Sequence, residues 1–233
     1  MTPAHPGSAR RQRNKLSANA VTRRPSAKTR QRLLESARRL LEEGGYAAAS
    51  VQAIAKRAGV ATGALYRHYP SKAELFVEVF RDAANRDLEA MQQAAAGGDV
   101  VQRLEAAVAT FARRALRSRR LAWALVHEPV DERVDAERLL HRRHYCRQLA
   151  SLLSECIAAG EIPQQNAELT AAALVGAIAE ALLGPLSPIQ EQPGTNEGIV
   201  AMLVRFCRQS IGVGNGARRQ RSVVPTERGS RRR

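Results

Sequence analysis

The sequence predicts an all-α protein. Alanine, leucine, arginine and glutamate dominate its 233 residues, and these residues lose little side-chain freedom in a helix. Aromatic residues make up only 4%, and no alternating apolar and polar run is longer than a few residues. Apolar residues instead recur at helical spacing between glycine and proline breaks. The length fits one large or two small domains.

The first predicted helix begins near Ser26 and ends at the Gly44–Gly45 pair, because glycine commonly terminates helices. Its apolar residues share one face, with arginine and glutamate opposite: Leu33, Ala37, Leu40 and Leu41.

Two short helices follow, over residues 51–58 and 62–68. Ser50 is a good N-cap for the first of them, and Gly59 ends it. Its apolar positions have helical spacing: Val51, Ile54, Ala55 and Ala58. Pro70 interrupts the second, because proline cannot continue a helix.

A longer helix is predicted from the capping box Ser71–Glu74 to a point before Gly97–Gly98. Five more helical stretches follow, over about 99–117, 119–127, 131–159, 166–186 and 195–212. The breaks between them contain Pro129, Gly160 with Pro163, and the segment from Gly184 to Pro193.

The positive charge is unevenly distributed along the chain. Lysine and arginine number 37 against 22 acidic residues, a net charge of +15. Residues 1–25 and 213–233 carry +6 each and are expected to be disordered; residues 26–80 carry +4 and residues 81–212 carry −1. This asymmetry predicts that the N-terminal half binds a polyanion such as nucleic acid. The alternative for the tails is that they are merely solvated ends.

Several other classes of protein are disfavoured. Cys146, Cys156 and Cys207 form no CxxC pair, which predicts a reducing compartment without a disulfide framework. No segment is expected to reach the roughly 20 apolar residues that a bilayer needs. The best candidate, Leu169 to Ala179, is flanked by Glu168 and Glu180 and is interpreted as a buried helix. No secretory signal is visible at the N-terminus.

From the sequence we expect no enzyme activity and no metal or cofactor site. Motifs of the GxSxG, HExxH and Walker A types are absent, and the Gly212–Gly216 cluster is interpreted as a linker. His141 and His144 with Cys146 raise the possibility of a metal sensor. However, Cys146 lies on another helical face and no carboxylate completes the set, so the histidines are expected to be core or solvated residues.

The segment from Val51 to Tyr69 predicts a helix-turn-helix. Ala55 is small where two helices would cross, Gly59 permits a positive φ in the turn, and Val60 with Leu65 fills the space between the helices. From Thr29 to about Phe80 the sequence resembles the TetR family of bacterial transcriptional regulators. About a dozen pattern positions match, including the run from Ser50 to Tyr69 and Lys72 with Leu75 and Phe76.

The resemblance implies a three-helix DNA-binding head over residues 26–87 and a larger helical effector-binding and dimerisation body over residues 88–212. The expected protein is a cytoplasmic, nucleoid-associated, dimeric repressor that binds a near-palindromic operator in double-stranded DNA and is released by a small-molecule effector. The alternative is a nonspecific nucleoid-type protein that uses the basic tails.

The resemblance also implies roles for individual residues of the head. The helix after Ser50 faces a phosphate, Thr62, Gly63 and Ala64 face base edges, and Tyr66 and His68 reach phosphate or base. Lys72 holds the DNA backbone, and Lys28 with Arg30 adds contacts. An alternative role for Tyr66 is packing against Tyr46. Ala61 and Tyr69 also belong to the expected DNA-binding set. Ala61 stands where the family commonly has a serine or threonine cap, and Thr62 is a candidate to take over that cap. Tyr69 stands where the family usually has phenylalanine, a change that is tolerable if its hydroxyl reaches solvent.

In the body, five residues are candidates for the effector pocket, although such a stripe is first of all core. They are Phe111, Trp123, His127, His141 and Tyr145. The last two helices carry apolar residues on more than one side, which predicts a homodimer interface. The alternative is an internal hairpin in a monomer.

Overall fold

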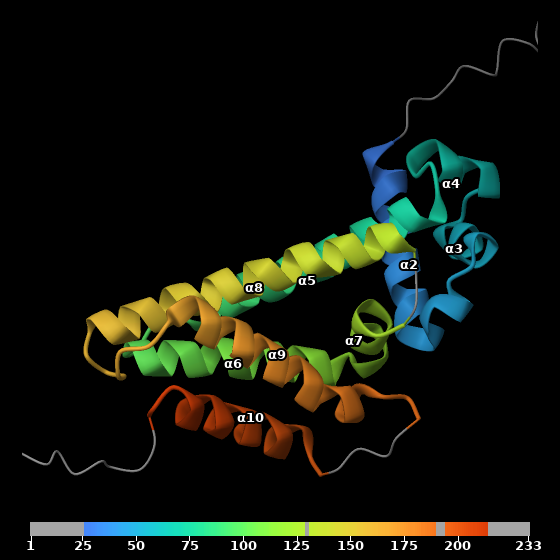
Figure 1. Ribbon diagram of the computed structural model, residues 1–233. Coiled ribbons are helices and arrows are strands. Elements are labelled where there is room, and N and C mark those ends of the chain that lie inside the picture. The colour runs from blue at the N-terminus through green and yellow to red at the C-terminus, as the bar shows by residue number, and fades with distance from the viewer. Residues whose placement is uncertain (1–25, 129–130, 190–193, 214–233) are drawn as a thin grey trace, which may run out of the picture. The chain divides into compact units, whose positions relative to one another are not determined.

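The computed structural model describes residues 26–128, 131–189 and 194–213. Within them the chain is helical and has no strand, which confirms the all-α prediction (Figure 1). The predicted tails, apart from Val213, lie outside the described residues. The helices are α2 (Ala27–Ala48), α3 (Val51–Ala58), α4 (Thr62–His68), α5 (Lys72–Ala94), α6 (Val100–Arg117), α7 (Arg119–Val126), α8 (Glu132–Ala158), α9 (Ala167–Leu186) and α10 (Asn196–Ser210).

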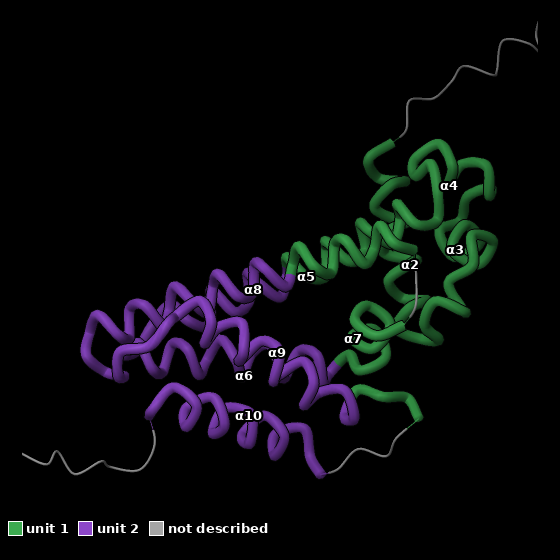
Figure 2. Tube along the Cα trace, viewed as in Figure 1, with its two compact units in different colours: residues 1–85, 118–141, 186–189 green, residues 86–117, 142–185, 190–233 purple. Residues whose placement is uncertain are grey.

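The chain divides into two compact units (Figure 2). The described residues of the first unit come from Met1–Asn85, Ser118–His141 and Leu186–Ile189; those of the second come from Arg86–Arg117, Arg142–Pro185 and Gln190–Arg233. The first unit is therefore larger than the predicted head of residues 26–87, since it also includes α7 and the start of α8.

The core of the first unit explains this extension. Leu33, Leu41, Ile54, Leu65 and Leu75 from α2 to α5 are fully buried together. Side chains that lie later in the sequence complete the same core: Leu121, Ala124, Leu125 and Val134. Removal of apolar surface from water drives this packing at about 25 cal/mol per Å². The three predicted helices of the head thus depend on α7 for part of their core.

Glycine shapes two bends in this unit. Gly45 has φ +67° and ψ −162°, so α2 breaks there as predicted before a short continuation to Ala48. Gly59 has φ +64° at the end of α3, a left-handed conformation that favours glycine.

In the second unit, α10 packs along α6 (Figure 1). Two ion pairs join these helices, Arg113 Nε to Glu197 Oε1 at 3.1 Å and Arg208 Nη1 to Glu105 Oε1 at 2.7 Å. Leu104, Ala107 and Leu116 of α6 are buried in this unit. Cys146, Cys156 and Cys207 are free thiols.

Helix α9 differs from its prediction in one respect. No apolar segment near 20 residues was expected from the sequence, whereas α9 spans 20 residues, and its most apolar window has a mean hydropathy of 1.8. Past Glu180 the helix continues through Ala181, Leu182 and Leu183 to Leu186, so the two glutamates do not bound it. By length and composition alone α9 could cross a bilayer, but the core helix of a soluble protein passes the same test. Only a third of that window is buried within the chain.

Candidate nucleic-acid interface

Helices α3 and α4 form the predicted helix-turn-helix. The Oγ of Ser50 accepts a hydrogen bond from the backbone N–H of Ala53 at 3.1 Å, so Ser50 caps α3. The N–H of Gly59 donates to Lys56 at 3.1 Å, and that of Val60 donates to Ala55 at 3.0 Å. Ala55 is 1% exposed, as the close approach of two helices requires.

Helix α4 has one buried face and one exposed face. Ala64 and Leu65 are buried, whereas Thr62, Gly63, Tyr66 and Arg67 are exposed. The exposed positions are related by steps of three or four residues, which places them on one side of a helix. We call these four residues the reading face of α4. Tyr66 is 52% exposed, an unusual position for so large an apolar ring.

The structure places two residues of the predicted DNA contact in the core instead. Ala64 is 9% exposed and Tyr69 is 2% exposed. The Tyr69 hydroxyl donates a hydrogen bond to the carbonyl of Arg30 at 3.4 Å. Burial raises the pKa of Tyr69 to about 12. Both residues therefore act through packing.

The N-terminus of α4 lacks a side-chain cap. Ala61 occupies the cap position and makes no such hydrogen bond, and Thr62 does not replace it. The first turn is closed through the backbone, where the N–H of Ala64 donates to the carbonyl of Ala61 at 2.8 Å. A short helix without a cap depends on packing for its stability.

The predicted cationic residues have different environments. Lys28 is exposed. The Nζ of Lys72 lies 5.0 Å from the centre of the Phe76 ring, and burial lowers the pKa of Lys72. Arg30 forms a bidentate ion pair with Glu78 and lies over the ring of Tyr69, so its charge is already partnered.

The remaining predictions concern the ring side chains of His68 and Tyr66. His68 is half-buried, and its Nδ1 makes no hydrogen bond with any described residue. The Tyr46 ring packs edge-on against Phe76, with centroids 4.7 Å apart. Among the described residues no ring contact joins Tyr46 and Tyr66, and the exposure of Tyr66 favours an outward role over the packing alternative.

Two exposed cations of this unit were not among the residues expected from the sequence: Arg67 on α4 and Lys56 on α3. Across the described ranges, neither forms an ion pair with an acidic side chain. The position of Arg67 could have been inferred from the sequence, because Arg67 lies four residues after Gly63 and therefore on the same side of the helix.

An ion-paired contact fixes the end of α2 to α7. The Glu128 carboxylate accepts a hydrogen bond from the Tyr46 N–H at 2.8 Å and pairs with Arg120 at 2.9 Å. Arg120 also donates to the carbonyl of Gly44 at 3.1 Å. We call Arg120 and Glu128 the α2–α7 clamp. Burial raises the pKa of Tyr46 beside it to about 12.

The five predicted effector residues are divided between the units. In the second unit the rings of Phe111 and Tyr145 pack 5.4 Å apart, and burial raises the pKa of Tyr145. In the first unit Trp123 and His127 pack 4.9 Å apart, and His141, 4% exposed, packs against Phe80. No cluster of three or more metal-ligating side chains occurs in the part of the chain that the structure describes.

Comparison with known proteins gives matches over both parts of the chain. A family model described as bacterial regulatory proteins, tetR family, matches residues 33–79. A second, described as tetracyclin repressor-like, C-terminal domain, matches residues 97–182. The transcriptional repressor KstR of Mycolicibacterium smegmatis is 34% identical over 111 residues, which are 47% of this chain and 54% of that protein. The chain spans about half the length, or less, of the curated relatives it matches.

Solved structures share the fold. The fatty acid degradation regulator FadR of Bacillus halodurans has a TM-score of 0.67 at 21% identity, covering 83% of this chain and 97% of that one. FadR of Bacillus subtilis in complex with stearoyl-CoA has a TM-score of 0.64 at 20% identity, covering 79% and 99%. At these identities the likeness bears on the fold alone.

Proposed function

The chain belongs to the TetR family of bacterial regulatory proteins, and on that premise we propose that it is a sequence-specific DNA-binding transcriptional regulator. The observation that carries the proposal is the reading face of α4, which presents Thr62, Gly63, Tyr66 and Arg67 to solvent from a helix whose opposite side is buried. A helix of this kind fits the major groove, where a threonine methyl contacts thymine and arginine pairs with guanine or phosphate.

The surrounding residues supply backbone contacts in this proposal. The amides at the start of α3 face a phosphate after Ser50, and Lys28, Lys56 and Lys72 add cationic contacts. His68 lies at the edge of this surface. Ala61 allows close approach at the start of α4, while Ala64 and Tyr69 support the helix from the core.

The protein acts as a homodimer in this proposal. Large apolar side chains are exposed on the last two helices, Leu169 at 68% on α9 and Met202 at 61% with Phe206 at 45% on α10. A second copy of the chain would cover them across a two-fold axis. Two recognition helices on such an axis read a near-palindromic operator.

A small-molecule effector releases the repressor from its operator. The repressor KstR and the FadR structure with stearoyl-CoA support this assignment by family likeness. Binding in the body alters the separation of the two recognition helices, so that they no longer fit successive major grooves. Crosslinks that fix this separation abolish the effector response; a response that persists contradicts the mechanism.

The relatives are named as transcriptional regulators, and we infer that this chain has no catalytic role and acts in the cytoplasm on nucleoid DNA. Footprinting of the region upstream of its own gene tests the proposal. The expected result is a protected near-palindrome with half-sites about 10 bp apart or a multiple of it. Uniform protection without half-sites would support the nonspecific nucleoid alternative instead.

A further inference from the structure

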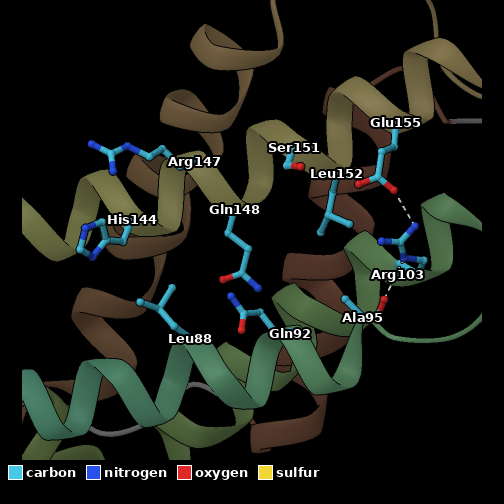
Figure 3. A pocket seen from close by; sticks show the side chains of 10 residues that line it. All are labelled: Leu88, Gln92, Ala95, Arg103, His144, Arg147, Gln148, Ser151, Leu152 and Glu155. Atoms are coloured by element: carbon cyan, nitrogen blue, oxygen red, sulfur yellow. Dashed lines mark hydrogen bonds and ion pairs between the residues drawn. The ribbon is translucent and has the colours of Figure 1, made fainter.

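The second unit contains a pocket of about 510 Å³ (Figure 3). It is lined by residues near the end of α5, by Arg103 of α6, and by one side of α8 from His144 to Glu155. None of the five effector residues expected from the sequence lines it. Leu88 and Leu152 contribute apolar surface, while the amides of Gln92 and Gln148 point toward one another in the middle.

The two ends of the pocket differ in charge. At one end Arg103 pairs with Glu155 at 2.6 Å and donates to the carbonyl of Ala95 at 2.8 Å, so its charge is balanced. At the other end lies Arg147, which is exposed beside His144. None of the described acidic side chains pairs with Arg147. A guanidinium in this position offers paired donors that suit a carboxylate or a phosphate.

A buried hydrogen-bond acceptor lies between these ends. The Oε1 atom of Gln148 is buried and accepts no hydrogen bond from any residue that the structure describes. Buried polar atoms without a partner are uncommon in folded proteins and destabilise them. A bound molecule with an N–H or O–H group at this depth would satisfy the acceptor.

We propose that this pocket binds a small, partly apolar organic acid. Its carboxylate or phosphate pairs with Arg147, a donor group reaches Oε1 of Gln148, and its apolar part lies against Leu88 and Leu152. The inference rests on the proposed function, in which an effector binds the body, and it specifies the chemical class of that effector. The balanced Arg103–Glu155 end does not attract a second anion.

Hippurate is a suitable probe because it combines a carboxylate, an amide N–H and a benzene ring. Its neutral amide, hippuramide, has nearly the same size and shape but replaces the carboxylate by an uncharged CONH2 group. Equilibrium dialysis of the full chain measures both. For a ligand of this size we expect hippurate to bind with a dissociation constant of about 1 mM or tighter, and about tenfold more tightly than hippuramide, since a charge-assisted hydrogen bond is lost in the amide. Equal binding of the two probes, or no saturable hippurate binding, overturns the proposal.

Two variants locate the site. Arg147→Gln is expected to remove the tenfold preference, whereas Arg143→Gln, at an exposed arginine on the same helix that does not line the pocket, is expected to keep it. O-Benzoylglycolate replaces the amide N–H of hippurate by oxygen, and it should bind the wild type several-fold more weakly than hippurate. In Gln148→Leu that difference should vanish. A preference that survives Arg147→Gln, or disappears equally in Arg143→Gln, contradicts the assignment.

Binding to operator DNA is measured separately, by fluorescence anisotropy without the probes. If the wild-type chain binds operator DNA but does not prefer hippurate over hippuramide, the proposed pocket ligand is wrong and the proposed regulator stands. Saturable hippurate binding by a chain that does not discriminate operator from random DNA overturns the proposed regulator and leaves the pocket standing. Circular dichroism melting of each variant confirms that it is folded.

Discussion

Adjacent residues of α4 have different roles because a helix turns about 100° per residue. Tyr66 and Arg67 are exposed, whereas Leu65 is fully buried. Residue type alone did not separate them: the family resemblance assigned Ala64 and Tyr69 to DNA together with Thr62 and Gly63. Helical spacing alone does not exclude Ala64, which lies three residues before the exposed Arg67. Tyr69 is buried in a core that includes Leu33 and Leu41, which are distant from it in sequence.

Replacement of Tyr69 by phenylalanine should change the alkaline stability of the protein. Tyr69 has an ordinary pKa of 10.0 that burial raises to about 12. Below pH 10 both states keep the proton; between pH 10 and 12 the unfolded chain loses it first, so stability falls as pH rises. The wild type should lose about 2–3 kcal/mol more than Tyr69→Phe over this range. Urea unfolding at several pH values measures the difference.

Parallel pH curves for the wild type and Tyr69→Phe would show that the hydroxyl is not buried. Because Tyr69 lies in the core, the same variant should bind operator DNA with unchanged affinity at neutral pH. A loss of affinity without a loss of stability would return Tyr69 to the DNA interface.

Arg67→Ala should weaken DNA binding in a salt-dependent manner. If the exposed guanidinium contacts a phosphate, the slope of log K against log salt should decrease by about one unit per subunit. Fluorescence anisotropy at several salt concentrations measures this slope. Arg143→Ala, at an exposed arginine of the second unit, is the matched control and should leave the slope unchanged. An unchanged slope for Arg67→Ala excludes the phosphate contact.

At the scale of elements, helix ends were predictable because local chemistry sets them. Ser50 caps α3, Gly59 ends it with φ +64°, and the Oγ of Ser71 accepts from the N–H of Glu74 at 3.2 Å, as the capping box requires. Packing partners were not predictable to the same degree. The α2–α7 clamp joins residues about 80 positions apart, and no local pattern distinguishes Glu128 from other surface glutamates.

Glu128→Ala should destabilise the first unit. It leaves the Tyr46 N–H without its acceptor and Arg120 without its carboxylate, a loss of roughly 1–3 kcal/mol in the free energy of unfolding. Chemical denaturation with tryptophan fluorescence reports the change, because Trp123 lies on α7 within the same unit. Glu89→Ala, at an exposed glutamate of α5, should change stability by less than about 0.5 kcal/mol. Equal effects of the two variants would show that the clamp contributes nothing specific.

For the molecule as a whole, the distribution of charge predicted two parts with different functions but not the boundary between them. The charge asymmetry between residues 26–80 and 81–212 indicated a head and a body. The compact units divide differently, because Leu121, Leu125 and Val134 complete the core of the first unit. Such long-range burial leaves no trace in local charge, so the sequence could not show that α7 belongs with the head.

Phe206→Glu should convert the protein to a monomer. A charge within an apolar interface between copies is costly to bury, and Phe206 is exposed within one chain, so its own fold should persist. Sedimentation velocity should give half the wild-type mass together with a large loss of operator affinity. Leu139→Glu, at an exposed leucine of α8, should remain dimeric. A wild type that sediments as a monomer would favour the internal-hairpin alternative.

The most direct measurement is a competition experiment between the protected upstream sequence and a scrambled duplex of equal length and composition at physiological salt. If the reading face of α4 recognises base edges, the protected sequence should compete at least about 10³-fold better. Equal competition would mean that the chain binds DNA through charge alone, and the assignment of a sequence-specific regulator would then be wrong.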